Sequence, residues 1–179
     1  MLGPHQPLLY YAAAAARSRQ ATVERLDWQP AQALGPTTPA DEVQAWVLGQ
    51  VGPALDRLGG QPLLVAKSLG THAAPLAADR GLPAVWLTPL LHEELVVEAL
   101  RRARAPFLLV GGTADTPAWD GELARSLTPY VCEVPEADHG MHVPGPVAAT
   151  AAVHGQVATA VERFLDEVLW PAAVSGSGR

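Results

Sequence analysis

The sequence predicts an α/β fold with a predominantly parallel β-sheet and helices on both of its faces. Two observations lead to this prediction. Short apolar segments of strand length alternate along the chain with longer segments of helical character. Several of the short segments, such as residues 63–66 and 107–110, are apolar at every position, which is typical of parallel strands buried on both faces.

The first third of the chain predicts two helices and one strand. Residues 7–20 are good helix formers, and residues 21–28 alternate in places and suit a strand. Thr38 is predicted to cap a second helix, which ends at Gly59-Gly60 because glycine commonly terminates helices.

The rest of the chain predicts a regular succession of strands and helices, with no linker inside it. We expect one domain over residues 1–170 and a flexible tail over residues 171–179. The predicted elements are a strand at 62–67, a helix to about 80, a strand at 84–87, a helix at 93–104, a strand at 106–110, a helix at 120–127, a strand at 130–134 and a last helix at 147–170.

The composition is that of a folded globular protein. The chain has 179 residues, of which 49% are hydrophobic and 17% are charged, which suffices for one sizeable core. The formal net charge is −6 and no basic stripe occurs, so we expect no nucleic-acid partner. The single cysteine, Cys132, excludes an intrachain disulfide and a multi-cysteine metal site, and its apolar neighbour predicts a buried packing role.

No apolar segment has the length of a membrane span, which is roughly 18 residues. Residues 8–16 resemble the apolar core of a signal peptide, but no basic residue precedes them, and Arg17 and Arg19 follow them. We therefore expect an ordinary helix there, a cytoplasmic protein, and no membrane partner.

The segment around Ser68 has the features of a sharp strand-to-helix turn. An apolar run leads to Ser68, and an Ala-rich helical segment follows it. Ala66 and Gly70, two residues away on either side, are small, as the close approach of strand and helix backbones in such a turn requires. The pattern A-x-S-x-G therefore predicts that the Ser68 hydroxyl is held at the apex of the turn.

Two further polar residues follow predicted strands. Asp115 comes after the strand at 106–110 through a Gly-Gly-Thr-Ala turn, and His139 lies just beyond the last strand. Active groups of parallel sheets gather at the carboxyl ends of the strands. A serine nucleophile needs a base, histidine titrates near neutral pH, and a carboxylate can orient the imidazole, so this set suits nucleophilic catalysis.

These segments together resemble the α/β-hydrolase family, which has a nucleophile elbow and the chain order Ser, Asp or Glu, His. The resemblance covers about residues 22–170 and implies that Ser68 is the nucleophile, His139 the general base and later acid, and Asp115 its orienting partner. It also implies that the backbone N–H of Leu69 is one donor of the oxyanion hole. The matching segments are Ala66-Lys67-Ser68-Leu69-Gly70, Gly112-Thr113-Ala114-Asp115 and Asp138-His139-Gly140.

The sequence departs from the family pattern in two places. Ala66 stands where the family has its first glycine, which the small-residue requirement tolerates. The family also has a central strand before the first helix, and the loop after that strand supplies a second oxyanion N–H. Only Met1 and Leu2 precede Gly3 here, so either the true start lies upstream or the fold is N-terminally abbreviated. Residues 3–6 would then be the remnant of that loop, with Gly3 as the second donor.

Each candidate residue also has a plainer interpretation. Ser68 could cap the following helix, and Asp120 is a rival of Asp115, although Asp120 more naturally caps the next helix. His139 and His142 with Asp138 suggest a metal site, but a third matched ligand is missing. Lys67 suggests a Ser–Lys dyad, but adjacent residues in such a turn point apart.

The sequence therefore predicts a small serine hydrolase for carboxylic esters or thioesters, with no cofactor, no metal and a small-molecule ester as its partner. No insertion is long enough for a helical lid, so we expect an open site that favours small or exposed acyl groups. Candidate pocket residues are His5, Leu90 and Trp119, and a core role is equally consistent for Leu90 and Trp119. The alternative function is a non-catalytic α/β-hydrolase-like module that binds a ligand or partner.

Overall fold

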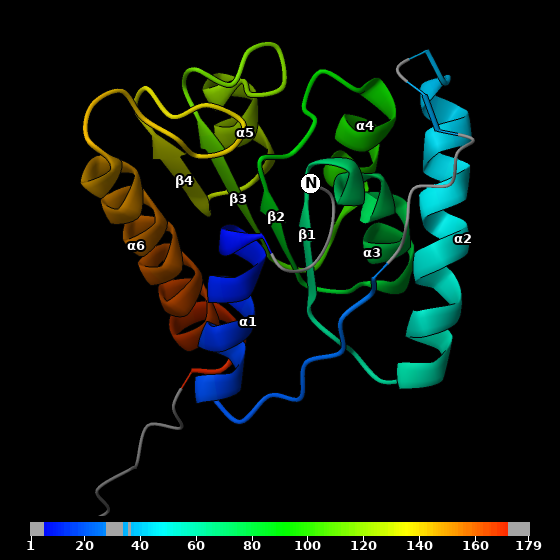
Figure 1. Cartoon of the computed structure of the whole chain (residues 1–179). Coiled ribbons are helices and arrows are strands. Elements are labelled where there is room, and N and C mark those ends of the chain that lie inside the picture. Colours follow the sequence, from blue (N-terminus) through cyan, green and yellow to red (C-terminus); the bar gives the residue numbers. More distant parts are fainter. Residues whose placement is uncertain (1–5, 28–33, 36, 172–179) are drawn as a thin grey trace, which may run out of the picture.

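Four parallel strands form one sheet in the computed structural model, which describes residues 6–27, 34–35 and 37–171 (Figure 1). The strands lie side by side in chain order, so that all four carboxyl ends share one edge of the sheet. They are β1 (Leu64–Lys67), β2 (Ala84–Leu87), β3 (Phe107–Gly112) and β4 (Val131–Val134). All four predicted strands from residue 62 onward are thereby confirmed, and the tail at 172–179 lies outside the described residues.

Helices cover both faces of this sheet, as predicted. When strands follow one another in order, right-handed crossovers place every connecting helix on the same face. That face carries α2 (Ala40–Leu58), α3 (Ala74–Arg80), α4 (Glu94–Arg102) and α5 (Gly121–Leu127), and the other face carries α1 (Pro7–Ser18) and α6 (Val147–Phe164).

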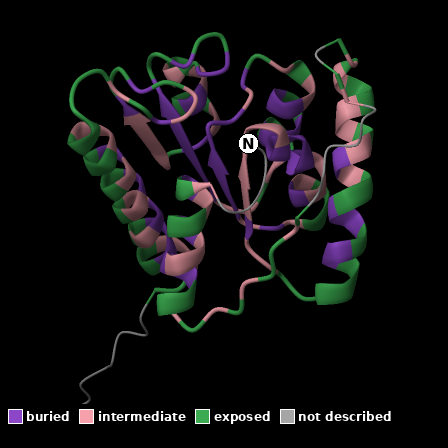
Figure 2. Cartoon of the chain, viewed as in Figure 1, coloured by how far each residue is buried: buried purple, intermediate pink, exposed green. Residues whose placement is uncertain are grey.

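The two faces of the sheet bury separate apolar clusters because successive strand side chains point to opposite sides. In β2, Ala84 and Trp86 pack toward α2–α5, whereas Val85 and Leu87 pack toward α1 and α6. The two central strands, β2 and β3, are buried along their whole length, as Figure 2 shows. This explains why their sequences are apolar at nearly every position.

Strand β1 lies at the edge of the sheet. It pairs with β2 on one side, and no described segment pairs with it on the other. The strand predicted at residues 21–28 is wrong for residues 21–27, which form no strand, and Trp28 lies outside the described residues. Four of the seven residues of this segment are exposed, but it still contacts the core and α2: Leu26 packs on the core, and Glu24 accepts a hydrogen bond of 3.2 Å from Arg57 of α2.

The helix ends differ in detail from the predictions. The N-cap of α2 is Pro39, and the Thr38 hydroxyl instead accepts a 2.8 Å hydrogen bond from the Gly35 N–H in the preceding turn. Helix α2 ends at Leu58, and its C-cap is Gly59, whose φ of +62° explains the requirement for glycine there. The last helix passes into a π-helical segment, Leu165–Leu169. None of the described helices combines the length and apolarity needed to cross a membrane.

Candidate active site

The Ser68 turn joins the end of β1 to a short 3-10 helix, Ser68–Ala73. Ser68 has a φ of +50°, a backbone conformation that is costly for a residue with a side chain. A Cβ atom added at Gly70 would lie 2.9 Å from the Cβ of Ala66. The strand and the 3-10 helix therefore approach each other so closely that both flanking residues must be small.

The buried hydroxyl of Thr71 holds the backbone of Ser68 in place. Thr71 Oγ1 donates a 2.7 Å hydrogen bond to the Ser68 carbonyl oxygen and accepts one of 3.4 Å from the Leu90 N–H. The N-cap position of the 3-10 helix is Lys67 and Ser68 is the first helical residue, so the alternative role of Ser68 as a helix cap is not supported. The Ser68 hydroxyl contacts His139 instead.

Asp115 is held at the carboxyl end of β3 and is only 6% exposed. The turn that leads to it lies directly against the loop that follows β4, since the Ala114 N–H donates a 3.0 Å hydrogen bond to the Ala137 carbonyl oxygen. A Cβ atom at Gly112 would lie 2.1 Å from that same oxygen. Glycine at 112 therefore allows the two loops that carry Asp115 and His139 to touch.

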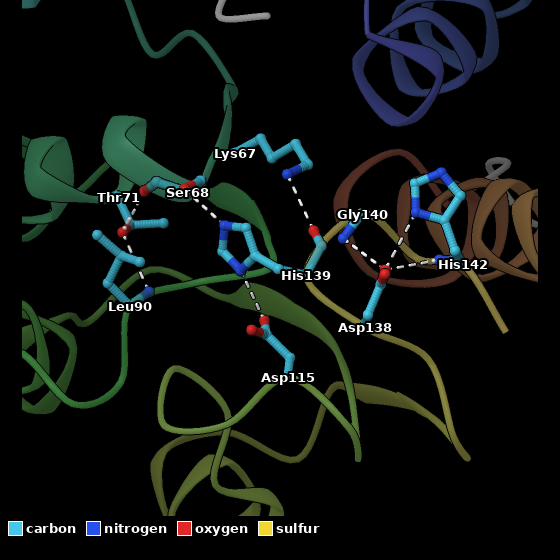
Figure 3. Close-up of polar contacts among 9 residues, drawn as sticks. All are labelled: Lys67, Ser68, Thr71, Leu90, Asp115, Asp138, His139, Gly140 and His142. Atoms are coloured by element: carbon cyan, nitrogen blue, oxygen red, sulfur yellow. Dashed lines mark hydrogen bonds and ion pairs between the residues drawn. The ribbon is translucent and has the colours of Figure 1, made fainter.

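The His139 loop is shaped by Asp138. Its carboxylate Oδ1 accepts hydrogen bonds of 2.8 Å from the backbone N–H groups of Gly140 and His142. Burial alone would raise the pKa of Asp138, but these N–H groups and the His142 side chain outweigh it and lower that pKa. Asp138 thus remains an anion that holds the turn, while the neighbouring His139 points the other way (Figure 3).

The imidazole of His139 lies between Ser68 and Asp115 (Figure 3). Its Nδ1 is 2.8 Å from Oδ2 of Asp115, and its Nε2 is 2.7 Å from the Oγ of Ser68. A carboxylate only accepts hydrogen bonds, so Nδ1 donates to Asp115. Nε2 is then the acceptor for the Ser68 hydroxyl, which is the arrangement that a general base requires. The structure thus brings together the three residues that the sequence singled out.

The rival interpretations of nearby residues have structural answers. The Asp120 side chain caps α5 by accepting hydrogen bonds of 2.9 Å from the Glu122 and Leu123 N–H groups, so it is not the partner of His139. Lys67 Nζ donates to the His139 carbonyl oxygen at 3.1 Å rather than pairing with Ser68. Within the described residues, no cluster of three His, Cys, Asp or Glu side chains is arranged to hold a metal ion.

An apolar groove with a volume of about 660 Å³ opens beside Ser68 and His139. We call it the β1 groove, because it runs along the open edge of β1 between α1 and α2. Its walls include Leu9 and Ala13 of α1, and Ala54 and Leu55 of α2. Residues 21–26 also line it, so the chain between α1 and α2 gives the site a wall of mixed apolar and polar residues that the sequence did not predict.

The remaining predicted site residues differ in where they lie. Leu69 is the second residue of the 3-10 helix and lines the groove, and backbone N–H groups at a helix start have no partner within the helix. Leu90 and Trp119 do not line the groove. Trp119 belongs to the core: its ring fills the space that Gly111 leaves, and its indole N–H donates a 2.8 Å hydrogen bond to Glu133. Gly3 and His5 lie outside the described residues.

Two contributors to the site were not identified from the sequence. The first is the contact between Lys67 and the His139 carbonyl oxygen, which joins residues 72 positions apart. Its one sequence signal is that Lys67 is the only lysine of the chain. The second is Thr71, whose hydroxyl supports the turn of Ser68. A threonine three residues after a serine is common in helices, so its position in the sequence gave no signal of this role.

The comparisons with known proteins agree with this architecture at the level of the fold. No protein-family model matches the sequence, and no curated protein matches it. Among solved structures, the chain is similar to an alpha-beta serine hydrolase homologue from Coxiella burnetii, with a TM-score of 0.64 and 15% sequence identity over 91% of this chain and 78% of that chain. The chain therefore has an α/β fold of the kind found in α/β serine hydrolases.

Proposed function

We propose that this protein is a serine hydrolase that cleaves small carboxylic esters or thioesters through an acyl-Ser68 intermediate. The observation that carries the proposal is the continuous pair of hydrogen bonds from Ser68 Oγ to His139 Nε2 at 2.7 Å and from His139 Nδ1 to Asp115 at 2.8 Å. The buried carboxylate fixes the tautomer in which Nε2 can accept a proton. The solved structure with a similar fold is that of a serine hydrolase homologue, which agrees with this class of chemistry.

In the acylation step, Ser68 Oγ attacks the carbonyl carbon of the ester while its proton passes to His139 Nε2. A tetrahedral intermediate forms with its negative charge on the former carbonyl oxygen. His139 then returns the proton to the leaving alcohol or thiol as the bond to the carbonyl carbon breaks, which leaves the acyl group on Ser68. Asp115 remains an anion throughout and stabilises the imidazolium form of His139.

In the deacylation step, water takes the place of the alcohol. His139 removes a proton from the water as its oxygen attacks the acyl-Ser68 carbonyl carbon, and then returns the proton to Ser68 Oγ. The products are a carboxylic acid and the free enzyme. His139 is 40% exposed at its side chain, which supports access for this water from solvent.

The N–H of Leu69 is the donor that we assign to the tetrahedral oxyanion. The N–H of Gly3 is the second donor implied by the family resemblance, and it lies outside the described residues. Loss of one such donor typically lowers the rate by about 100- to 1000-fold. We therefore expect turnover well below that of an enzyme with a complete oxyanion hole wherever the second donor is missing.

A fluorophosphonate probe tests the proposal directly, because it reacts covalently with activated serine nucleophiles. We expect the probe to label the wild-type protein at Ser68 and to leave Ser68→Ala unlabelled. Ser68→Ala should also abolish ester turnover while leaving the melting temperature nearly unchanged, since the substitution removes one oxygen atom. A folded wild-type protein that stays unlabelled would refute the enzyme proposal.

The β1 groove favours one alternative, a non-catalytic module that binds an apolar ligand or partner. This alternative shares the fold but does not use the hydrogen bonds among Ser68, His139 and Asp115. A protein that is unreactive toward the probe and still binds a small ester would support it. Labelling of Ser68 by the probe would exclude it.

A further inference from the structure

Lys67 stands out among the cationic residues of this protein. The chain has one lysine and eleven arginines, and the single lysine directly precedes Ser68. Lysine side chains normally extend into water. That of Lys67 is partly buried instead, and its Nζ donates a 3.1 Å hydrogen bond to the backbone carbonyl oxygen of His139 (Figure 3).

The contact of Lys67 acts on the residue that Ser68 also contacts. Adjacent residues at the end of β1 hold His139 at two points: Ser68 contacts its imidazole, and Lys67 contacts its backbone. Asp138 fixes the part of the loop that follows His139, through the N–H groups of Gly140 and His142. The carbonyl of His139 is therefore bonded to β1 by Lys67, whereas the part of the loop before His139 is bonded to the turn after β3 through Ala137.

We propose that Lys67 is a positioning residue, whose ammonium group holds the His139 loop at the distance from β1 that the Ser68–His139 hydrogen bond requires. This inference rests on the hydrolase function proposed above. Lys67 takes no proton from Ser68 and touches no reacting atom. Its effect is to keep Nε2 of His139 aligned with Ser68 Oγ, and small misalignments of reacting groups are costly in rate.

The electrostatic surroundings of Lys67 agree with a charged group held in place. Burial lowers the pKa of Lys67 below its ordinary value, while Asp115 at the end of β3 and Asp138 in the loop after β4 act in the opposite direction. The hydrogen bond to a carbonyl is strongest when the donor is charged. As the pH rises, Lys67 should therefore lose its proton at a lower pH than a solvent-exposed lysine does. The hydrogen bond from Lys67 to the His139 carbonyl oxygen should weaken at that pH.

The first experiment measures the state of Lys67 without any turnover. Because the chain has one lysine, reductive methylation with ¹³C-formaldehyde places a single labelled ε-amine in the protein, whose NMR signal is distinct from that of the N-terminus. We expect the pKa of this amine to be lower in the folded protein than in urea, where the amine is exposed to solvent. The same low value is expected in Ser68→Ala, which has no nucleophile. An amine whose NMR chemical shift and titration in the folded protein are both those of the urea-unfolded chain would overturn the proposal, because it would show a side chain that makes no contact.

The second experiment compares Lys67→Met, which keeps the aliphatic stem, with Lys67→Arg, which keeps the charge and the donor. Loss of one charge-assisted hydrogen bond predicts a fall in kcat for p-nitrophenyl butyrate of about 10- to 100-fold in Lys67→Met, with KM changed by less than about twofold. Lys67→Arg should recover most of this loss. A folded Lys67→Met with wild-type kcat, or a folded Lys67→Arg as slow as Lys67→Met, would overturn the proposal.

The pH profile of kcat separates positioning from a merely structural role. The wild-type kcat should fall on the alkaline side at the pH where the labelled amine titrates. In Lys67→Arg this fall should move to higher pH, because a guanidinium stays charged. The Lys67→Arg profile also decides the matter if Lys67→Met does not fold, since an alkaline fall identical to the wild type would overturn the proposal. A wild-type protein that the fluorophosphonate probe does not label would refute the hydrolase function, whereas an amine with the chemical shift and titration of the unfolded chain would refute only the contact.

Discussion

Gly112 and Ala137 touch at a point where no side chain fits: a Cβ at Gly112 would lie 2.1 Å from the Ala137 carbonyl oxygen. Gly112 ends β3, three residues before Asp115, and Ala137 lies two residues before His139. The distance between the acid and the base is therefore set by a backbone contact between their loops as well as by the hydrogen bond between their side chains.

We expect Gly112→Ala to push these two loops apart. The clash involves backbone atoms, so it should cost about 1–3 kcal/mol in the free energy of unfolding and lower kcat by lengthening the His139–Asp115 contact. Gly155→Ala in α6 is the matched control, because nothing lies within 4 Å of the added Cβ and alanine favours a helix. Urea unfolding and ester turnover measure both effects. Wild-type turnover in Gly112→Ala would contradict the role given to this contact.

Substitution of Asp115 should mainly lower turnover, whereas substitution of Asp120 should mainly lower stability. Asp115→Asn keeps the size of the side chain but removes the carboxylate that fixes the tautomer of His139, so we expect kcat to fall by roughly 1,000- to 10,000-fold. Asp120→Ala removes the cap of α5 and should cost about 1 kcal/mol of stability with little change in kcat. Turnover and urea unfolding of both variants provide the comparison, and equal losses of turnover would contradict the assignment.

The contact between Ala66 and Gly70 predicts a pair of compensating substitutions. Gly70→Ala places a Cβ 2.9 Å from that of Ala66, so it should destabilise the turn and slow the labelling of Ser68 by a fluorophosphonate. Adding Ala66→Gly removes the opposing Cβ and should restore most of the labelling rate. If the double variant is as slow as Gly70→Ala, steric crowding does not control this turn.

The stability of the protein should fall in mild acid because of His72. Burial lowers the pKa of His72, which Glu93 opposes and His92 reinforces. His72 then binds a proton more readily in the unfolded chain than in the folded protein. The free energy of unfolding therefore has its highest value above about pH 6.5 and decreases as the pH falls below it. His72→Leu should flatten this dependence in urea unfolding at pH 7.5 and 5.5, whereas the exposed His142→Gln should retain it.

The β1 groove predicts a dependence on acyl length. If the acyl chain lies along its apolar walls, each added methylene contributes about 0.8 kcal/mol, or roughly a fourfold rise in kcat/KM. We expect p-nitrophenyl esters to improve from acetate through butyrate to hexanoate. If kcat/KM stays constant or falls with acyl length, the acyl group stays outside the groove. That result would agree with the sequence-based expectation of an open site that favours small or exposed acyl groups.

The sequence was most informative where a segment is buried on both sides. Strands β2 and β3 are apolar at nearly every position, and short apolar segments of this kind are typical of strands whose two faces are both covered by helices, so both were predicted nearly to the residue. Residues 21–27 show the limit of the approach. Alternation indicates an extended segment with one buried side, and the surface of a helix can bury that side as well as a sheet can.

For the site, the order of Ser68, Asp115 and His139 was readable because each residue follows its own strand. Trp119 was ambiguous, since an aromatic residue near Asp115 suits a pocket or the core equally. The bare backbone of Gly111 makes room for its ring, which no local pattern reveals. The link from Lys67 to His139 spans 72 positions and joins a side chain to a backbone oxygen, so its one signal in residue types is that Lys67 is the single lysine.

Because β1 lies at the edge of the sheet, the catalytic arrangement can be lost while the rest of the protein stays folded. Asp115 is anchored to β3, which has a strand on each side, whereas Ser68 follows a strand with a single neighbour among the described segments. Loss of the pairing between β1 and β2 would move the nucleophile away from Asp115, which follows a strand with a neighbour on each side. Whatever covers the free side of β1 would therefore stabilise the position of Ser68 and, through Lys67, that of the His139 loop.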